Sequence, residues 1–130
     1  MKEVYEFLKE CGVYYLGTID NGKPRVRPFG TIEIFEDHLY IQTGKKKEVY
    51  KQIKNNPKVE LSCFKDGKWL RVTGKLIADD RIEAKKDMLD KNPDLRRMYD
   101  ENDDNTIVLY FETGTATFSS FTEEPRVIKF

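Results

Sequence analysis

The sequence contains few of the residues that build metal sites, disulfide frameworks and nucleophilic catalytic centres. It has two cysteines and one histidine, and Cys11 and Cys63 stand far apart in the chain. Zinc sites and small disulfide-rich domains instead place cysteine in close pairs, in zinc sites often with histidine. His38 lies in a polar stretch, 36–38, that is typical of a solvated turn. We therefore predict no metal site and no catalytic residue, and we expect both cysteines to be small buried apolar residues.

An excess of one charge and a long apolar run are also missing. Lys and Arg total 23 and Asp and Glu total 23, so the formal net charge is zero. Such a chain has no overall field to hold nucleic acid by counterion release. No segment approaches the roughly 20 apolar residues of a membrane span, and the charged first residues do not resemble a signal peptide. We expect a cytoplasmic protein with no nucleic-acid partner and no membrane partner.

Aromatic residues are well represented and predict a folded core. Phe, Trp and Tyr make up 12% of the chain, and each buries a large apolar area, which argues against disorder. A length of 130 residues corresponds to one domain, and no repeat or linker divides it. The sequence therefore predicts a single domain spanning 1–130.

Hydrophobic periodicity predicts hairpin-linked strands with helices inserted at fixed points. Asn21-Gly22 and Asp66-Gly67 are strong hairpin turn signals. Pro24 and Pro28 cannot donate to a sheet ladder, so the strand that contains them is expected to lie at an edge or to split. The pattern favours a mainly β, α+β fold: a closed or nearly closed antiparallel barrel of six or so strands with a few covering helices. Helices are predicted at 2–11, 47–55, 81–91 and 93–99, and strands at 13–20, 23–35, 39–43, 59–64, 69–78, 106–113 and 115–121.

The segment Thr43-Gly44-Lys45-Lys46-Lys47 closes a predicted strand and opens a predicted helix. Three cations there oppose the helix dipole, which favours negative charge at a helix N-terminus. Free backbone N–H groups, a threonine hydroxyl and several lysines are the components of a phosphate site. The alternative is a solvated basic turn, and the spacing is not that of a Walker motif.

Two strand faces carry arginine beside an aromatic ring. Alternation places Arg25, Arg27 and Phe29 on one face of their strand. Arginine binds phosphate in bidentate fashion and stacks on flat conjugated systems, so this face suits a phosphorylated aromatic ligand. The alternative is a solvated face on which both arginines pair with nearby carboxylates, those of Asp20, Glu33 or Glu36. Trp69, Arg71 and Thr73 form a similar set, which a core tryptophan beside a surface arginine explains nearly as well.

These motifs resemble a known family when they are taken in order. The chain carries Tyr15-Leu16-Gly17-Thr18, Arg25-Val26-Arg27-Pro28-Phe29-Gly30, Leu39-Tyr40-Ile41-Gln42-Thr43-Gly44, Gln52-Ile53-Lys54-Asn55-Asn56-Pro57 and Trp69-Leu70-Arg71-Val72-Thr73-Gly74. Their order and spacing resemble the flavin-binding split barrels of the pyridoxamine 5'-phosphate oxidase-like superfamily, in the small single-domain branch of nitroimidazole-resistance-type proteins. The resemblance covers about residues 4–80, and the last third only by element order.

The resemblance implies a homodimer of six-stranded antiparallel split β-barrels that binds FMN in two symmetric grooves at the subunit interface. In this sequence the phosphate ligands would be Arg25, Thr43, Lys46 and Lys47. Val26, Arg27 and Pro28 would lie along the isoalloxazine ring, and Trp69, Leu70 and Arg71 would close the groove. Vitamin B6 oxidation is not expected, because those oxidases bind their substrate with a longer C-terminal segment.

The leading hypothesis is an FMN-binding flavoprotein, an oxidoreductase that passes hydride or electrons through FMN to an unidentified small molecule. This chemistry needs no protein nucleophile. Within the superfamily, the deazaflavin F420 or haem could replace FMN. From another class, the protein could be a flavin-binding or sensing module without turnover. Single-stranded nucleic-acid binding would need a basic groove, which the zero net charge disfavours.

Overall fold

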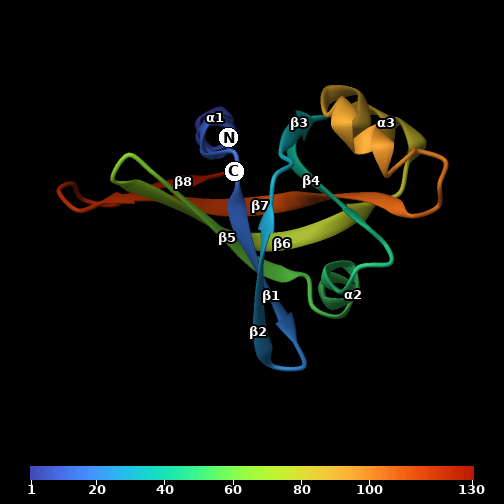
Figure 1. The fold of residues 1–130 in the computed structure, drawn as a ribbon. Helices are drawn as coiled ribbons and strands as arrows, with labels where there is room; N and C mark the ends of the chain where they lie inside the picture. Colours follow the sequence, from blue (N-terminus) through green and yellow to red (C-terminus); the bar gives the residue numbers. More distant parts are fainter.

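Eight strands and three α-helices make up the computed structural model, which describes residues 1–130 (Figure 1). All strands belong to one antiparallel sheet, ordered β2-β1-β5-β6-β7-β4-β3, with β8 paired to β7. No helix is both long enough and apolar enough to cross a membrane. The elements are α1 (Lys2–Cys11), β1 (Tyr14–Asp20), β2 (Lys23–Phe29), β3 (Glu33–Phe35), β4 (His38–Gly44), α2 (Glu48–Asn55), β5 (Lys58–Lys65), β6 (Lys68–Asp79), α3 (Ile82–Lys91), the 3-10 helix η1 (Pro93–Arg97), β7 (Thr106–Ser120) and β8 (Arg126–Lys129).

The predicted hairpins are confirmed. Asn21 and Gly22 both have positive φ, 50° and 82°, and so do Asp66 and Gly67, 52° and 75°. Positive φ at both central residues defines the two-residue turn whose twist matches the flanking strands. The turns therefore fix the registers of β1 with β2 and of β5 with β6.

The proline-bearing strand splits, as predicted, and its two parts lie at opposite edges of the sheet. β2 ends at Phe29 and pairs only with β1, whereas β3 pairs only with β4. The connection at 30–32 crosses between these edges, held by a hydrogen bond of 2.6 Å from the Tyr14 hydroxyl to the Thr31 carbonyl oxygen. Beyond Tyr40, β4 has β7 on one side and no strand on the other. At this seam between the two edges the Gln42 backbone N–H donates to the Thr31 hydroxyl at 3.2 Å, so a side chain rather than a strand borders β4 there.

The strand count and the closure of the sheet differ from the prediction. The sheet has eight strands rather than six, and its outermost members, β2 and β3, do not pair with each other. The segments 106–113 and 115–121 are one continuous strand, because Gly114 does not break it. Gly114 is opposite Gly74, and the Phe130 ring lies where a side chain at 114 would stand. β8, which the prediction lacked, brings Phe130 to that position.

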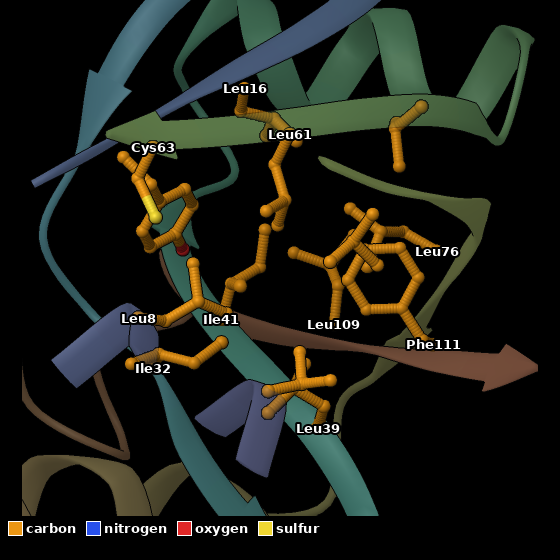
Figure 2. Packing of buried hydrophobic residues seen from close by; sticks show 14 of the residues in the cluster. Leu8, Leu16, Ile32, Leu39, Ile41, Leu61, Cys63, Leu76, Leu109 and Phe111 are labelled. Carbon is orange, nitrogen blue, oxygen red and sulfur yellow. The ribbon is translucent and has the colours of Figure 1, made fainter. Parts of the chain in front are cut away.

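The inner face of the sheet surrounds one cluster of 19 buried apolar residues, to which α1 and α2 contribute. Leu16, Leu61 and Leu109 are among its members (Figure 2). Cys63 is buried in this cluster and Cys11 packs against it half-buried, and burial raises the pKa of the Cys63 thiol. A second cluster has only four members and holds α3 on the opposite face: Tyr40, Ala84, Met88 and Val108.

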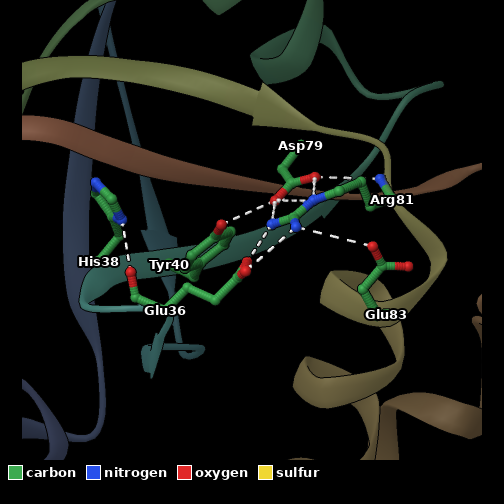
Figure 3. Close-up of polar contacts among 6 residues, drawn as sticks. All are labelled: Glu36, His38, Tyr40, Asp79, Arg81 and Glu83. Carbon is green, nitrogen blue, oxygen red and sulfur yellow. Dashed lines mark hydrogen bonds and ion pairs between the residues drawn. The ribbon is translucent and has the colours of Figure 1, made fainter.

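A polar network beside the second cluster joins the end of β6 to the turn before β4 (Figure 3). Asp79 is 8% exposed and accepts hydrogen bonds from the Tyr40 hydroxyl, at 2.8 Å, and from the Arg81 guanidinium, at 2.8 and 3.0 Å. Arg81 also pairs with Glu36. Burial raises the pKa of Asp79, but the hydrogen bonds from Arg81 and Tyr40 outweigh it, so the pKa lies below its ordinary value.

Asp79 makes the free energy of unfolding depend on pH. Because its folded pKa is lowered, its contribution is complete above the unfolded pKa of about 3.9 and disappears as pH falls through the folded pKa. Asp79→Asn should lower the free energy of unfolding by about 1–3 kcal/mol at neutral pH and by less in acid. Urea unfolding from neutral to acid pH measures this, with the exposed Asp37→Asn as control. Parallel pH profiles for the parent and Asp79→Asn would contradict it.

Candidate functional site

A groove of about 590 Å³ lies along the seam between the sheet edges. One wall is the end of β2 and its connection, Arg27–Thr31, together with β4 and the start of α2. The other wall is the end of α3 with η1 and the residues after it. Its lining therefore combines backbone without a strand partner, apolar side chains and a few polar groups. The lining residues are Arg27–Thr31, Gln42, Thr43, Lys47, Val49, Lys91–Leu95, Met98 and Tyr99.

The turn between β4 and α2 brings a hydroxyl and an ammonium group into this groove. Thr43 is 3% exposed, and its hydroxyl makes no hydrogen bond to a protein group. Lys47 is the N-cap of α2, no side chain caps that helix, and no carboxylate lies within ion-pair distance of its ammonium. Free N–H groups at a helix N-terminus and a free cation both favour an anion. This end of the groove is therefore built to receive one.

The other two lysines of the turn differ from Lys47. The Lys45 ammonium pairs with Asp80 at 3.1 Å and with Asp104 at 3.5 Å. The Lys46 side chain is exposed and does not line the groove, and its backbone N–H donates to the Asn105 side-chain oxygen at 3.1 Å. The crowding of cations that the sequence shows is therefore partly neutralised, and only Lys47 lines the groove.

Arg27 adds a positive charge to the wall that also carries Lys47, and Lys91 lies on the other wall. Its guanidinium donates to the Thr18 hydroxyl at 2.7 Å, to the Gln52 side-chain oxygen at 2.6 Å and to the Leu16 carbonyl at 3.2 Å. All these acceptors are neutral. Burial, with a smaller effect from the charge of Arg25, lowers the pKa of Arg27. The protein thus holds a half-buried guanidinium beside the groove without an acidic partner.

Several predicted site residues do not line the groove of this chain. Arg25 is exposed and pairs with Asp20 at 3.2 Å, the arrangement of the solvated alternative. Val26 is 67% exposed on the outer side of β2. Leu70 is fully buried in the main core. Of the ten predicted residues the groove brings together four, namely Arg27, Pro28, Thr43 and Lys47.

Trp69 and Arg71 lie instead on the outer face of the sheet. Strand register places Gly17 opposite Val26, Ser62 opposite both Tyr15 and Arg71, and Phe64 opposite Trp69. Residues that oppose each other point to the same side of a sheet. We call the apolar residues gathered there the outer apolar face: Tyr15, Ile19, Val26, Phe64 and Trp69.

No pattern in the sequence indicated that the second wall of the groove would border a binding site. The segment 91–99 was predicted as helical, but nothing in its pattern pointed to a ligand. Pro93, Leu95 and Met98 resemble residues of any short amphipathic turn. Their role depends on where α3 packs, which only the tertiary structure shows.

A second hollow, of about 490 Å³, lies between α1 and the far end of β7. Its lining holds six carboxylates and three cations. Arg126 pairs with Glu3 and Lys65 pairs with Glu10. An anionic ligand would be repelled there, so the groove at the seam is the better candidate.

The sequence model of pyridoxamine 5'-phosphate oxidase matches residues 1–91. The chain belongs to the pyridoxamine 5'-phosphate oxidase family. A NimC/NimA family protein from Clostridium acetobutylicum is 44% identical, and the alignment covers all of this chain and 92% of that one with a TM-score of 0.97. The predicted resemblance to this superfamily and to its nitroimidazole-resistance-type branch is thereby confirmed. Among curated proteins, the sequence has no match.

More distant members of the fold are also similar in structure. General stress protein 26 from Bacillus anthracis is 19% identical over 99% of this chain and 98% of its own, with a TM-score of 0.78. A haem-binding protein from Mycobacterium smegmatis is 10% identical over 93% of this chain and 57% of its own, with a TM-score of 0.68. At these identities the likeness shows the shared fold alone.

Proposed function

We propose that this protein binds FMN in the groove and acts as an oxidoreductase toward a small molecule. The observation that carries the proposal is the convergence of the free Thr43 hydroxyl with the charges of Lys47 and Arg27, none of them matched by a carboxylate. Membership of the pyridoxamine 5'-phosphate oxidase family supports the same assignment.

The groove residues fit the two chemical parts of FMN. Thr43, Lys47 and the free start of α2 would hold the phosphate, because hydrogen bonds to charged groups are the strong ones. Arg27, Pro28 and the backbone that follows would lie along the ring, since the guanidinium is flat. Bound FMN supplies hydride or single-electron transfer. In our proposal Arg25 and Lys46 remain secondary phosphate ligands, and Arg25 would first have to leave Asp20.

The groove lacks the two commonest haem ligands, histidine and cysteine. His38 lies at a separate hollow, with its Nδ1 2.9 Å from the Glu36 carbonyl oxygen. Haem iron is usually held by histidine, cysteine, methionine or tyrosine. Met98 and Tyr99 do line the groove, so the spectrum of the purified protein must decide between the two groups.

We propose further that two copies pair through the outer apolar face. This face carries Val26 beside Pro28, which lines the groove, and it also carries Trp69 and Arg71. Pairing would remove exposed apolar area from water. It would also let Trp69 and Arg71 of a second copy close the groove, which accounts for their distance from it within one chain. Leu70 would contribute only its backbone.

The proposal predicts that the protein distinguishes FMN from riboflavin. If the phosphate makes even one charge-assisted contact, worth about 1.5–3 kcal/mol, riboflavin should bind at least about 10-fold more weakly. Flavin fluorescence titration measures both affinities. The spectrum and mass of any chromophore that copurifies separate FMN from F420 and haem. Equal affinities for FMN and riboflavin would overturn the phosphate site.

Turnover separates an enzyme from a sensing module. The bound flavin is reduced without oxygen and then mixed with candidate acceptors of the small-molecule class. Reoxidation that is faster with an acceptor than with buffer supports the oxidoreductase. Uniformly slow reoxidation with every acceptor would support the binding module.

A further inference from the structure

Tyr99 reaches the anion-binding end of the groove from the wall that the sequence did not reveal. It follows η1, and its backbone N–H donates to the Leu95 carbonyl at 2.9 Å. Its side chain is half-buried and lines the groove together with Thr43 and Lys47. Its hydroxyl makes no hydrogen bond to any protein group. A half-buried phenol usually finds a partner, so this hydroxyl is free for a ligand.

Gly44 makes room for the phenol. A Cβ at position 44 would stand 3.1 Å from the Tyr99 hydroxyl oxygen and 3.2 Å from its Cε1 atom, closer than ordinary contact. Gly44 is not among the residues with positive φ, so its backbone does not require glycine. What limits a side chain at position 44 is the space taken by Tyr99 and by the Asn105 side chain, whose Nδ2 atom would also stand 3.2 Å from that Cβ. Gly44 thus leaves room for two side chains from elsewhere in the chain, those of Tyr99 and Asn105.

The turn after Gly44 is held firmly from another side. The Asn105 carbonyl accepts from the Lys45 N–H at 2.7 Å, and the Asn105 side chain accepts from the Lys46 N–H at 3.1 Å. Thr43 and Lys47 therefore flank a turn that the chain itself holds before any ligand arrives, and Tyr99 lines the groove from the other wall. Such preorganisation reduces the entropy that binding costs.

We propose that the Tyr99 hydroxyl is a further binding group for the phosphate of the ligand, positioned by the absence of a side chain at Gly44. This inference rests on the proposed FMN function. In this proposal the segment just after η1 helps to hold the cofactor and also forms part of the wall of the groove.

The test compares Tyr99→Phe with the parent in FMN and riboflavin titrations. Loss of one hydrogen bond to a charged group should weaken FMN binding about 10-fold and riboflavin binding less than about twofold. The phosphorus NMR signal of bound FMN should also move. Tyr110→Phe is the matched control, because Tyr110 is half-buried on β7 and does not line the groove. It should bind FMN as the parent does.

Gly44→Ala provides a second variant, whose added methyl group crowds both the phenol and the Asn105 side chain. It should weaken FMN binding, and Tyr99→Phe should weaken binding less in the Gly44→Ala protein than in the parent, because part of the effect of the methyl group acts through the phenol. Independent, additive losses would overturn the link between Gly44 and Tyr99.

The outcomes separate this inference from the proposed function. If Lys47→Gln weakens FMN binding but Tyr99→Phe does not, the Tyr99 role is wrong and the FMN site stands. Equal losses for FMN and riboflavin in Tyr99→Phe would assign the ring to packing and overturn the phosphate contact. If the parent binds no FMN, the proposed function fails, and the Tyr99 role fails with it.

Discussion

Reversing the charge at the start of α2, with Lys47→Glu, is expected to weaken FMN binding about 100-fold or more. The change removes a charge-assisted contact and places a carboxylate beside the phosphate. Lys47 is exposed and has no protein partner to lose. The fold should therefore tolerate the substitution, and riboflavin binding should change much less.

The control for this reversal lies on the same helix. Lys54→Glu makes the same charge change near the other end of α2, where the side chain lies over the Tyr50 ring and outside the groove. Fluorescence titration with FMN, together with a thermal melt of each variant, measures the difference. If both variants lose the same affinity for FMN, the loss comes from the long-range electrostatic effect of the added negative charge, and Lys47 is not a phosphate ligand.

Placing a charge on the outer apolar face should separate the proposed dimer. In Val26→Glu, a carboxylate would be buried against the second copy without a partner, which should raise the dimer dissociation constant about 100-fold or more. Val26 is 67% exposed in the single chain, so its replacement should leave the monomer folded. Light scattering across a range of concentrations, with and without FMN, measures the change.

Ile82→Glu serves as the matched control for the dimer. Ile82 is also an exposed aliphatic residue, 45% exposed, but it begins α3 rather than belonging to the outer apolar face. It should leave the dimer intact. A Val26→Glu protein that remains dimeric and binds FMN like the parent would exclude this face as the interface and as part of the site.

Local signals in the sequence predicted most of the elements. The hairpins at Asn21-Gly22 and Asp66-Gly67 are encoded by residues that accept positive φ, and Pro24 and Pro28 exclude a central strand. The prediction failed at Gly114, where the reason for glycine is the ring of Phe130, distant in sequence. Local patterns do not contain such a contact.

The same limit applied to the candidate site. Thr43 and Lys47 were found because they surround one strand-to-helix turn, and Arg27 because it alternates beside Phe29. Which lysine is free depended on Asp80, far away in the chain. The wall that contains Tyr99 had no sequence signal, because its place is set by the packing of α3.

The two walls of the groove pack against hydrophobic clusters of different size. The wall from β2, β4 and α2 adjoins the cluster of 19 buried residues, whereas the wall from α3 and η1 is carried by the cluster of four. Parts of a protein with few buried contacts open at lower free energy than its core does. We therefore expect the second wall, Tyr99 included, to open at lower free energy than the sheet, whereas Thr43 and Lys47 stay in place on the wall that adjoins the larger cluster.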